Sequence, residues 1–375
     1  MVAAAGIGVP DLDRTFELPP RLREHLARLY PEHEITAIEP LAPDTGKTSS
    51  KTLKAAGYGR PVRIVLSRGD DVQEIVFRVA TADEFGHARR SDRAANLLLA
   101  FDDFSRVPEH VAPIDVGMID GSGAPISLRD GVEPYLLTTF VRGTIYAEDL
   151  RRVARTGAAT DQDVARVGAL ARYLARLHTP IDDPAGYRRA IRDLIGHGEG
   201  IFGIIDGYPP DVPGAPAERL AAIERRCVEW RWRLRAREGR LVRTHGDFHP
   251  FNIVFGEGGQ LTLLDASRGT QGDAADDLTA LAINYLLFAI DAPAAWRRGL
   301  APLWRELWRT YASERSDASL LACVPPFLAW RALVVCNPRF YPALSEGGRH
   351  ALLGFIEAAL DAAHFEPGWA DELFS

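Results

Sequence analysis

The sequence predicts an α+β protein with a small antiparallel-sheet lobe at the N-terminal side and a larger helical lobe after it. Two observations carry this prediction. Between Ile35 and Ala80, β-branched runs are separated by Gly and Asp residues, which is typical of strands joined by turns. Between Asp161 and His178, apolar residues recur at the spacing of an α-helix. With 375 residues, the chain is long enough for two or three domains or for one bilobal unit.

The N-terminal sheet is expected to contain three strands, Ile35–Ile38, Val62–Leu66 and Glu74–Val79, with Arg68–Asp71 as the turn of a hairpin between the last two. The capping-box sequence Thr81-Ala-Asp-Glu84 then predicts a helix that runs to about Phe101. Strand-like segments follow at 114–119 and 135–140.

Beyond residue 142 the pattern becomes helical. Besides the helix at 161–178, the sequence predicts helices at 219–237, 278–290, 301–311 and 349–363, and a strand–loop–strand region at 241–265. We therefore expect three parts: an N-terminal extension (1–33) that includes a short helix at 21–29, an N-lobe (34–140) and a helical C-lobe (141–375).

Composition excludes several classes of protein. Hydrophobic residues make up 46% and charged residues 25%, which is ordinary for a globular chain. The net charge of -7 provides no general basic field for nucleic acid or anionic lipid. The three cysteines lack CxxC spacing, and the longest apolar run, 281–290, is too short to span a bilayer. The start of the chain lacks the basic residues of a signal peptide. We expect a cytoplasmic protein without nucleic-acid or membrane partners; the oligomeric state is not predicted.

The strongest chemical signal is the segment His245-Gly-Asp-Phe-His-Pro-Phe-Asn252. Asp247 and Asn252 lie five residues apart in a loop between two β-rich segments, so both can face one cavity. Asp265 ends an apolar strand and can return to the same cavity. A carboxylate that can accept a hydroxyl proton, beside an Asn and an Asp that offer hard oxygen ligands, suits Mg²⁺-assisted phosphoryl transfer. Protein kinases use the same Asp-x4-Asn spacing.

With Gly272-Asp-Ala-Ala-Asp-Asp277-Leu, these motifs resemble the aminoglycoside phosphotransferase and choline kinase-like family. The segment from Leu170 to His178 is similar to the family's helix that ends in Leu-x-x-Leu-His. The apolar segment from Leu136 to Gly143 is similar to the family's hinge. The resemblance covers roughly residues 35–290, with four motifs in the family's order. It implies a bilobal protein-kinase-like fold, ATP between the lobes, Mg²⁺ as cofactor, and a small-molecule hydroxyl as acceptor, in an aminoglycoside-like antibiotic, an amino alcohol or a sugar.

The resemblance also implies roles for individual residues. Asp247 matches the catalytic base, and Asn252 and Asp265 match the Mg²⁺ ligands. Support of the catalytic loop, rather than chemistry, is implied for His245, His249 and Asp277. The hinge residues that would contact adenine are Thr139, Phe140 and Val141.

The residue that positions the phosphates departs from the protein-kinase pattern, because Arg78 stands where a Lys is expected. The planar guanidinium group of an arginine can bind phosphate through two parallel hydrogen bonds. Asp92 lies in the apolar stripe of the predicted helix, where a carboxylate needs a partner, so we expect it to pair with Arg78. Glu84 is the competing partner.

A Gly- and Ser-rich loop at 44–52 is expected to cover the phosphates through its backbone N–H groups. The residues of this loop that we assign to nucleotide binding are Gly46, Lys47, Thr48 and Ser49. The loop is not a Walker sequence, which would require Gly where the chain has Leu41.

Three alternative functions agree less well with the sequence. A catalytically silent nucleotide-binding protein is disfavoured by the intact set Asp247, Asn252 and Asp265. A protein kinase is disfavoured because the chain reads Asp-Ala-Ser from Asp265, without DFG or APE. A hydrolase metal cluster at His245-x-Asp-x-His249 would leave Asn252 and Asp265 unexplained. The sequence does not decide between ATP and GTP, nor whether Arg268 reaches a phosphate or pairs with Asp273.

Overall fold

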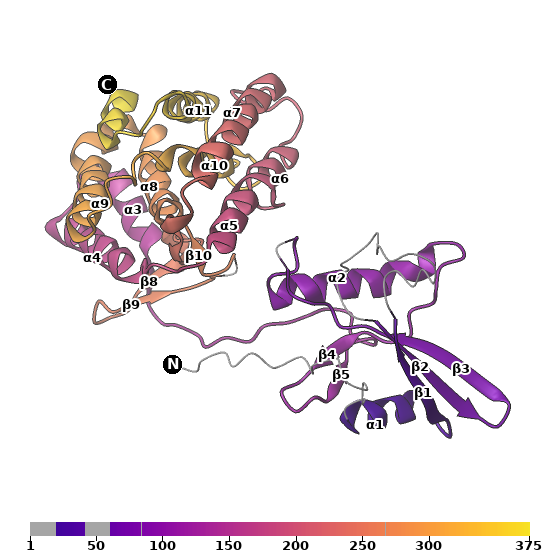
Figure 1. Cartoon of the computed structure of the whole chain (residues 1–375). Helices are drawn as coiled ribbons and strands as arrows, with labels where there is room; N and C mark the ends of the chain where they lie inside the picture. The colour runs from indigo at the N-terminus through magenta and orange to yellow at the C-terminus, as the bar shows by residue number, and fades with distance from the viewer. Residues whose placement is uncertain (1–19, 42–60, 84, 267) are drawn as a thin grey trace. The chain divides into compact units, whose positions relative to one another are not determined.

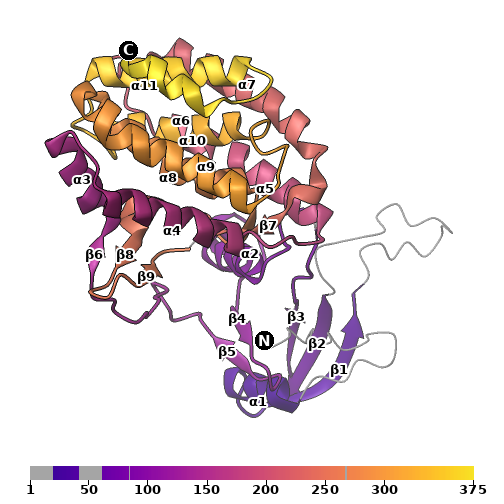
Figure 2. The same ribbon diagram turned by 90° about the vertical axis from the view of Figure 1, so that its left-hand side faces the viewer.

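The computed structural model describes residues 20–41, 61–83, 85–266 and 268–375. The chain divides into two compact units, residues 1–138 (unit 1) and 139–375 (unit 2) (Figures 1 and 2). The division falls inside the segment that resembles the family's hinge. Each unit is described by itself below.

Unit 1 contains an antiparallel sheet in the order β1-β2-β3, formed by β1 (Glu34–Pro40), β2 (Val62–Arg68) and β3 (Asp71–Phe77). The predicted hairpin is confirmed, because Arg68 pairs with Asp71 at the turn. Gly69 at this turn has φ +58°, a left-handed conformation that glycine adopts without steric cost.

The core of unit 1 lies between this sheet and α1 (Pro20–Leu29). Leu22 and Leu26 of α1 pack with the alternating inward side chains of β2, namely Val62, Ile64 and Leu66. The short helix expected in the N-terminal extension therefore contributes to this core. A two-stranded ribbon, β4 (Gly117–Ile119) and β5 (Pro125–Ser127), completes the sheet structure described in unit 1.

The helix predicted from Thr81 was placed too early. The helix α2 begins at Arg90 and ends at Asp103, followed by the 3₁₀ turn η1 (Phe104–Arg106). Asp83 accepts a hydrogen bond from the Phe85 amide at 2.8 Å, and Gly86 has φ +100°, which a right-handed helix excludes. The predicted apolar stripe is also not a buried face, since none of the α2 residues is buried.

The strand expected at 135–140 is a second error. This segment forms no strand with any described part of the chain, and the side chains of Tyr135, Leu136, Leu137 and Phe140 are exposed. Its β-branched and aromatic composition favours a strand, but composition without a pairing partner does not make one.

Unit 2 is mainly helical and surrounds one large apolar core. Helices α4 and α9 pack side by side, and α10 packs against both α8 and α11 (Figures 1 and 2). The helices are α3 (Tyr146–Thr156), α4 (Asp161–Leu177), α5 (Pro184–Gly196), α6 (Ile201–Asp206), α7 (Ala217–Arg235), α8 (Ala274–Ile290), α9 (Ala301–Glu314), α10 (Val324–Cys336) and α11 (Glu346–Asp361). Shorter helical turns are η2 (Glu238–Arg240), η3 (Pro250–Asn252), η4 (Pro293–Ala295), η5 (Trp296–Leu300) and η6 (Pro367–Phe374). The predicted α+β class, with a small antiparallel sheet before a larger helical part, is confirmed.

Two small antiparallel sheets among the described residues of unit 2 hold the loops that carry the predicted chemistry. One sheet pairs β7 (Val242–Arg243) with β10 (Gln271–Gly272). In the other, β8 (Ile253–Phe255) lies between β6 (Thr144–Ile145) and β9 (Leu261–Leu263), next to α3 (Figure 1). The loop 244–252 runs from β7 to β8 and the loop 264–270 runs from β9 to β10. The described ends of the two loops are hydrogen-bonded to each other, from the Leu264 amide to the Asn252 carbonyl at 2.9 Å and from the Thr244 amide to the Thr270 carbonyl at 3.1 Å.

The described helices include none that is long and apolar enough to cross a membrane.

Candidate active site

The backbone of the loop 244–252 is held from behind by Asp277 on α8. Its two carboxylate oxygens accept hydrogen bonds from the amides of His245 and Gly246, both at 2.8 Å. His178, at the C-terminal end of α4, hydrogen-bonds through Nε2 to Asp277 at 3.1 Å and through Nδ1 to the hydroxyl of Tyr311 at 2.7 Å. Asp277 and His178 are fully buried. A buried carboxylate is thus satisfied by the main chain of the loop that it positions.

Asp247 follows directly on this fixed backbone, and its carboxylate is surrounded by basic side chains. Arg331 of α10 donates a hydrogen bond from Nη1 to Oδ1 at 2.8 Å. Nη1 of Arg268 lies 3.3 Å from the same oxygen, and Nε2 of His249 lies 3.4 Å from Oδ2. Burial alone would raise the pKa of Asp247, but the contact with His249 and the charges of Arg331 and Arg268 outweigh it and hold the pKa well below its usual range. Asp247 is therefore ionised at neutral pH.

Asn252 and Asp265 come together at one end of the β8–β9 ladder. Asn252 precedes β8, its carbonyl accepts a hydrogen bond from the Leu264 amide at 2.9 Å, and Asp265 is the next residue. The Asn252 amide group donates from Nδ2 to the carbonyl of Asp247 at 3.1 Å, so its Oδ1 remains the atom for a ligand. Asp265 is exposed and has φ +50°, an uncommon conformation for a residue with a side chain.

These two residues fit a magnesium ion by the chemistry of their donors. Mg²⁺ in kinase-type sites is bound by one or two protein carboxylate or amide oxygens together with substrate phosphates, rather than by an all-protein cage. The described residues contain no cluster of three or more His, Cys, Asp or Glu side chains that could hold a metal by themselves.

The two histidines of the loop have local contacts. Nδ1 of His245 accepts a hydrogen bond from the amide of Asp247 at 3.3 Å, and the ring packs edge-on against Phe248. Nδ1 of His249 accepts from the amide of Phe251 at 3.2 Å, which leaves its Nε2 facing Asp247. Both contacts lie within the loop, as expected of supporting residues, and their roles remain predictions.

Sequence reasoning missed Arg331 and Asp276. Nη2 of Arg331 donates to the carbonyl of Gly246 at 3.0 Å and to Oδ1 of Asp276 at 2.5 Å. Burial, reinforced by the neighbouring Asp277, raises the pKa of Asp276 to about 6, although Arg331 opposes the shift. Asp276 lies inside the motif that contains Asp277, so the sequence offered a signal for this residue. Arg331 lies on a largely apolar helix, and no local sequence pattern pointed to it.

The undecided side chain, Arg268, reaches Asp247 rather than Asp273. Its Nε donates to Glu199 at 3.1 Å, and its guanidinium lies 4.9 Å from the ring centre of Trp330. Asp273 instead begins α8 as its N-cap and binds both Nε and Nη2 of Arg240, at 2.7 and 2.8 Å.

The site residues predicted in unit 1 and in the hinge are placed as follows. Arg78 is exposed and directly follows β3. Asp92 lies in the first turn of α2, where its Oδ2 accepts from the Arg89 amide at 2.7 Å. Thr139 and Phe140 are exposed and Val141 is half-buried, in a segment without regular structure. The residues Gly46, Lys47, Thr48 and Ser49, and also Glu84, lie outside the described residues.

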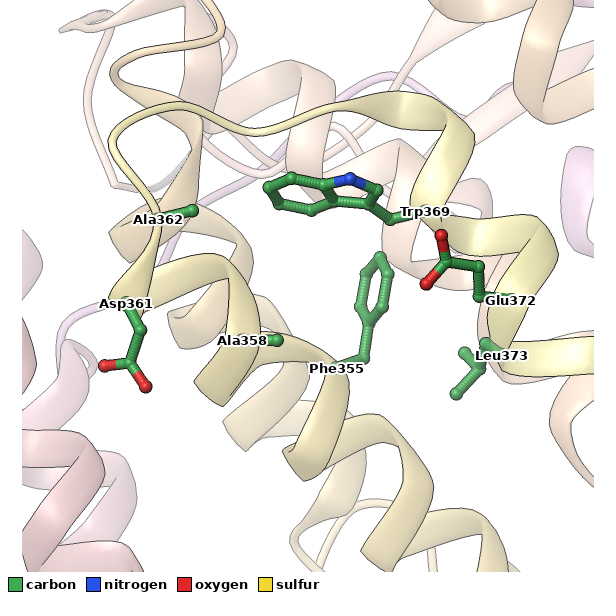
Figure 3. A pocket seen from close by; sticks show the side chains of 7 residues that line it. All are labelled: Phe355, Ala358, Asp361, Ala362, Trp369, Glu372 and Leu373. Carbon is green, nitrogen blue, oxygen red and sulfur yellow. The ribbon is translucent and has the colours of Figure 1, made fainter.

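A separate pocket of about 550 Å³ lies near the C-terminus (Figure 3). Figure 3 shows it between α11 and the last turns of the chain, with the rings of Phe355 and Trp369 beside it. Its lining also includes Asp361 and Glu372. It belongs to a different part of unit 2 from the loops that carry Asp247 and Asp265.

The sequence model of the phosphotransferase enzyme family matches residues 53–315, and the chain belongs to this family. The predicted family, the kinase-like fold class and the general class of phosphotransferase are thereby confirmed. No curated protein matches the chain.

Among solved structures, the chain is similar to a glucosamine kinase in complex with glucosamine, ADP and inorganic phosphate, with 20% identity, 57% of each chain covered and a TM-score of 0.37. An ethanolamine kinase of Plasmodium vivax shares 11% identity over 91% of this chain and 85% of that chain, with a TM-score of 0.34. An amicoumacin kinase in complex with AMP-PNP, Ca²⁺ and Ami shares 14% identity over 91% of this chain and 92% of that chain, with a TM-score of 0.35. The chain spans 57% and 64% of two glucosamine kinase structures that it matches.

Proposed function

We propose that this phosphotransferase uses ATP and Mg²⁺ to phosphorylate a hydroxyl group of a small molecule, such as an aminoglycoside-like antibiotic, an amino alcohol or a sugar. The observation that carries the proposal is the Asp247 carboxylate. It is ionised, fixed by Arg331 and by a loop backbone that Asp277 holds, and it lies in the loop that also supplies Asn252.

Asp247 has the chemistry to orient an acceptor hydroxyl. In the proposed reaction the hydroxyl oxygen bonds to the γ-phosphorus, the bond from phosphorus to the bridging oxygen of ADP breaks, and the hydroxyl proton passes toward Asp247. Because its pKa is low, Asp247 acts mainly by aligning the hydroxyl and holds the proton only late in the transfer.

Asn252 and Asp265 would hold Mg²⁺, which neutralises charge on the phosphates when it is bound. We further propose that Arg78, paired with Asp92, and the loop that contains Gly46, Lys47, Thr48 and Ser49 bind the phosphates. Thr139, Phe140 and Val141 would contact the adenine. The family membership supports these assignments, and each stays open to test.

The decisive substitution is Asp247→Asn, which keeps the shape of the side chain and removes its charge. Turnover should fall by about 10²- to 10⁴-fold, the range for a side chain that aligns a reacting group and receives its proton in the transition state. The affinity for ATP should change by less than about tenfold, or ~1.4 kcal/mol. Phosphoryl transfer from labelled ATP to sugars, amino alcohols and aminoglycosides, with and without Mg²⁺, measures the first quantity, and calorimetry measures the second.

Asp163→Asn is the matched control, because Asp163 is also a buried carboxylate of unit 2 but contacts Thr160 and Arg152 at the start of α4. Its turnover should remain near that of the wild type. Normal transfer by Asp247→Asn would remove the catalytic role of Asp247. If the wild type binds ATP but neither phosphorylates any acceptor nor hydrolyses ATP, the catalytically silent alternative is favoured.

A further inference from the structure

We propose that Arg331 of α10 is a positioning residue of the active site, which anchors Oδ1 of Asp247 so that Oδ2 is the oxygen that meets the acceptor hydroxyl. This inference rests on the proposed function and adds to it a residue outside the family motifs. It also assigns different tasks to the two oxygens of one carboxylate.

The guanidinium of Arg331 holds both the side chain and the backbone of the catalytic loop. Nη1 donates to Oδ1 of Asp247 at 2.8 Å, while Nη2 donates to the carbonyl of Gly246, the preceding residue, at 3.0 Å. A guanidinium is planar and rigid, so these two contacts together fix the rotation of the Asp247 side chain relative to its own main chain. Arg331 is 4% exposed, and hydrogen bonds in such an environment are weakly screened by water.

Arg331 is itself held in place from two sides. Nη2 also contacts Asp276 on α8 at 2.5 Å. The guanidinium carbon lies 3.9 Å from the ring centre of Trp330, the residue before it on α10, which is within the range of a cation–π interaction. The Trp330 ring is fixed in turn, because its Nε1 donates to the carbonyl of Glu199 at 2.9 Å. The arginine therefore has little freedom to follow a moving carboxylate.

The contacts of the two Asp247 oxygens differ. Oδ1 meets Arg331 at 2.8 Å and Arg268 at 3.3 Å. Oδ2 faces Nε2 of His249 at 3.4 Å, which is longer than the roughly 2.7–2.9 Å of a strong charged hydrogen bond. Oδ2 therefore has fewer and longer contacts with basic side chains than Oδ1 has. We assign the approach of the acceptor hydroxyl to Oδ2 for this reason.

A purely structural role is the competing explanation, because Arg331 also neutralises Asp276. The two explanations predict different effects on turnover and on stability. A structural arginine affects stability alone, whereas a positioning residue affects turnover only through Asp247. Arg349 on α11 provides a matched control, since it is also 4% exposed and donates to the carbonyls of Cys336, Pro213 and Leu344.

The test is a double-mutant cycle in the full-length protein, with single-turnover transfer from MgATP to an accepted substrate, or to water if no acceptor is found. Arg331→Met should lower kcat by about 10- to 100-fold, as expected when a catalytic group is misplaced. The KM for MgATP should change by less than about threefold. Arg331→Lys, which retains a charge but not the fork, should recover part of the loss.

The decisive comparison is made in the Asp247→Asn background. There, adding Arg331→Met should change kcat by less than about threefold, because the group that it positions is already inactive. Arg349→Met should lower the denaturation midpoint without this coupling to Asp247. If Arg331→Met does not fold, the pair Asp276→Asn/Arg331→Met removes the carboxylate left behind and replaces it in the cycle.

Two results would overturn the inference in an active protein: a folded Arg331→Met variant with wild-type kcat, or losses that simply multiply with those of Asp247→Asn. Failure of the proposed function looks different, because the wild type itself would then show no Mg²⁺-dependent turnover. The positioning role would fall with it in that case. Denaturation midpoints of the wild type, Arg331→Met, Asp247→Asn and the double variant would still show whether the two residues are coupled in the stability of the fold.

Discussion

In unit 2 the predicted catalytic loop is fixed by buried charged side chains, whereas in unit 1 the two predicted phosphate-site residues that the structure describes, Arg78 and Asp92, lie on an exposed and a locally bonded position. Asp277 is fully buried and binds two amides of the loop. Arg78 is exposed, and Asp92 accepts from the amide at the start of its own helix.

This contrast indicates that the predicted catalytic residues also contribute to stability in unit 2, whereas Arg78 and Asp92 of unit 1 contribute little to it. Removing one partner of a buried charged network leaves the other partners unsatisfied and costs several kcal/mol, whereas an exposed pair contributes about 0–1 kcal/mol. Substitutions behind the catalytic loop should therefore destabilise unit 2. Substitutions at Arg78 and Asp92 of unit 1 should change binding and leave stability nearly unchanged.

The largest effect on stability is expected for Asp277→Ala. It leaves two buried amides, those of His245 and Gly246, and the ring of His178 without their acceptor, so the free energy of unfolding should fall by about 3–5 kcal/mol. Urea denaturation measures this change. Asp361→Ala is the control, because the Asp361 side chain is 59% exposed. A loss for Asp277→Ala no larger than that of the control would remove the contrast between the units.

An intermediate effect is expected from the titration of Asp276. Its pKa is raised from 3.8 to about 6 in the folded protein, so the folded state binds a proton more readily than the unfolded chain. The ionised group therefore destabilises the fold above about pH 6, and this penalty is relieved as the pH falls toward 3.8. Between about pH 7.5 and 5.5, the wild type should gain ~1 kcal/mol relative to Asp276→Asn.

Urea denaturation of both proteins at the two pH values measures this difference, and the comparison cancels titrations that they share. Equal pH dependence in the two proteins would mean that Asp276 has an ordinary pKa, and that burial beside Asp277 has less influence than the structure indicates.

The smallest effects on stability are expected for Arg78→Ala and Asp92→Ala. Each should change the free energy of unfolding by about 1 kcal/mol or less, yet each should weaken ATP binding if the two residues form the proposed pair. The double variant should then lose less affinity than the sum of the single losses. Calorimetric ATP titrations provide the measurement. Additive losses of affinity would mean that Arg78 and Asp92 do not form a pair.

The sequence was most informative where chemistry depends on local spacing. Asp247 and Asn252 are placed by the loop that they share, and Asp265 by the strand that ends just before it. The beginning of α2 could not be predicted in this way, because the capping box at Thr81 competes with the turn at Gly86, whose positive φ excludes a helix.

Arg331 was beyond prediction for a different reason. It contacts Asp247 across 84 residues of sequence, from a helix whose other residues are mostly apolar. Tertiary packing alone creates this contact, and no local pattern records it. The segment 135–140 shows the opposite case, where a pattern typical of strands lacks a partner in the described part of the chain.

The two adjacent loops, 244–252 and 264–270, restrict where residues can be inserted into the chain. Each loop joins the β7–β10 ladder to the β8–β9 ladder, and the inward side chains of those strands, such as Val242 and Ile253, are buried. Because neighbouring strand residues face opposite sides, one inserted residue in either loop that shifted a ladder would turn these side chains out of the core. Related chains can therefore exchange residues within the loops more readily than they can gain or lose them, and diversity in loop length should fall elsewhere on the molecule.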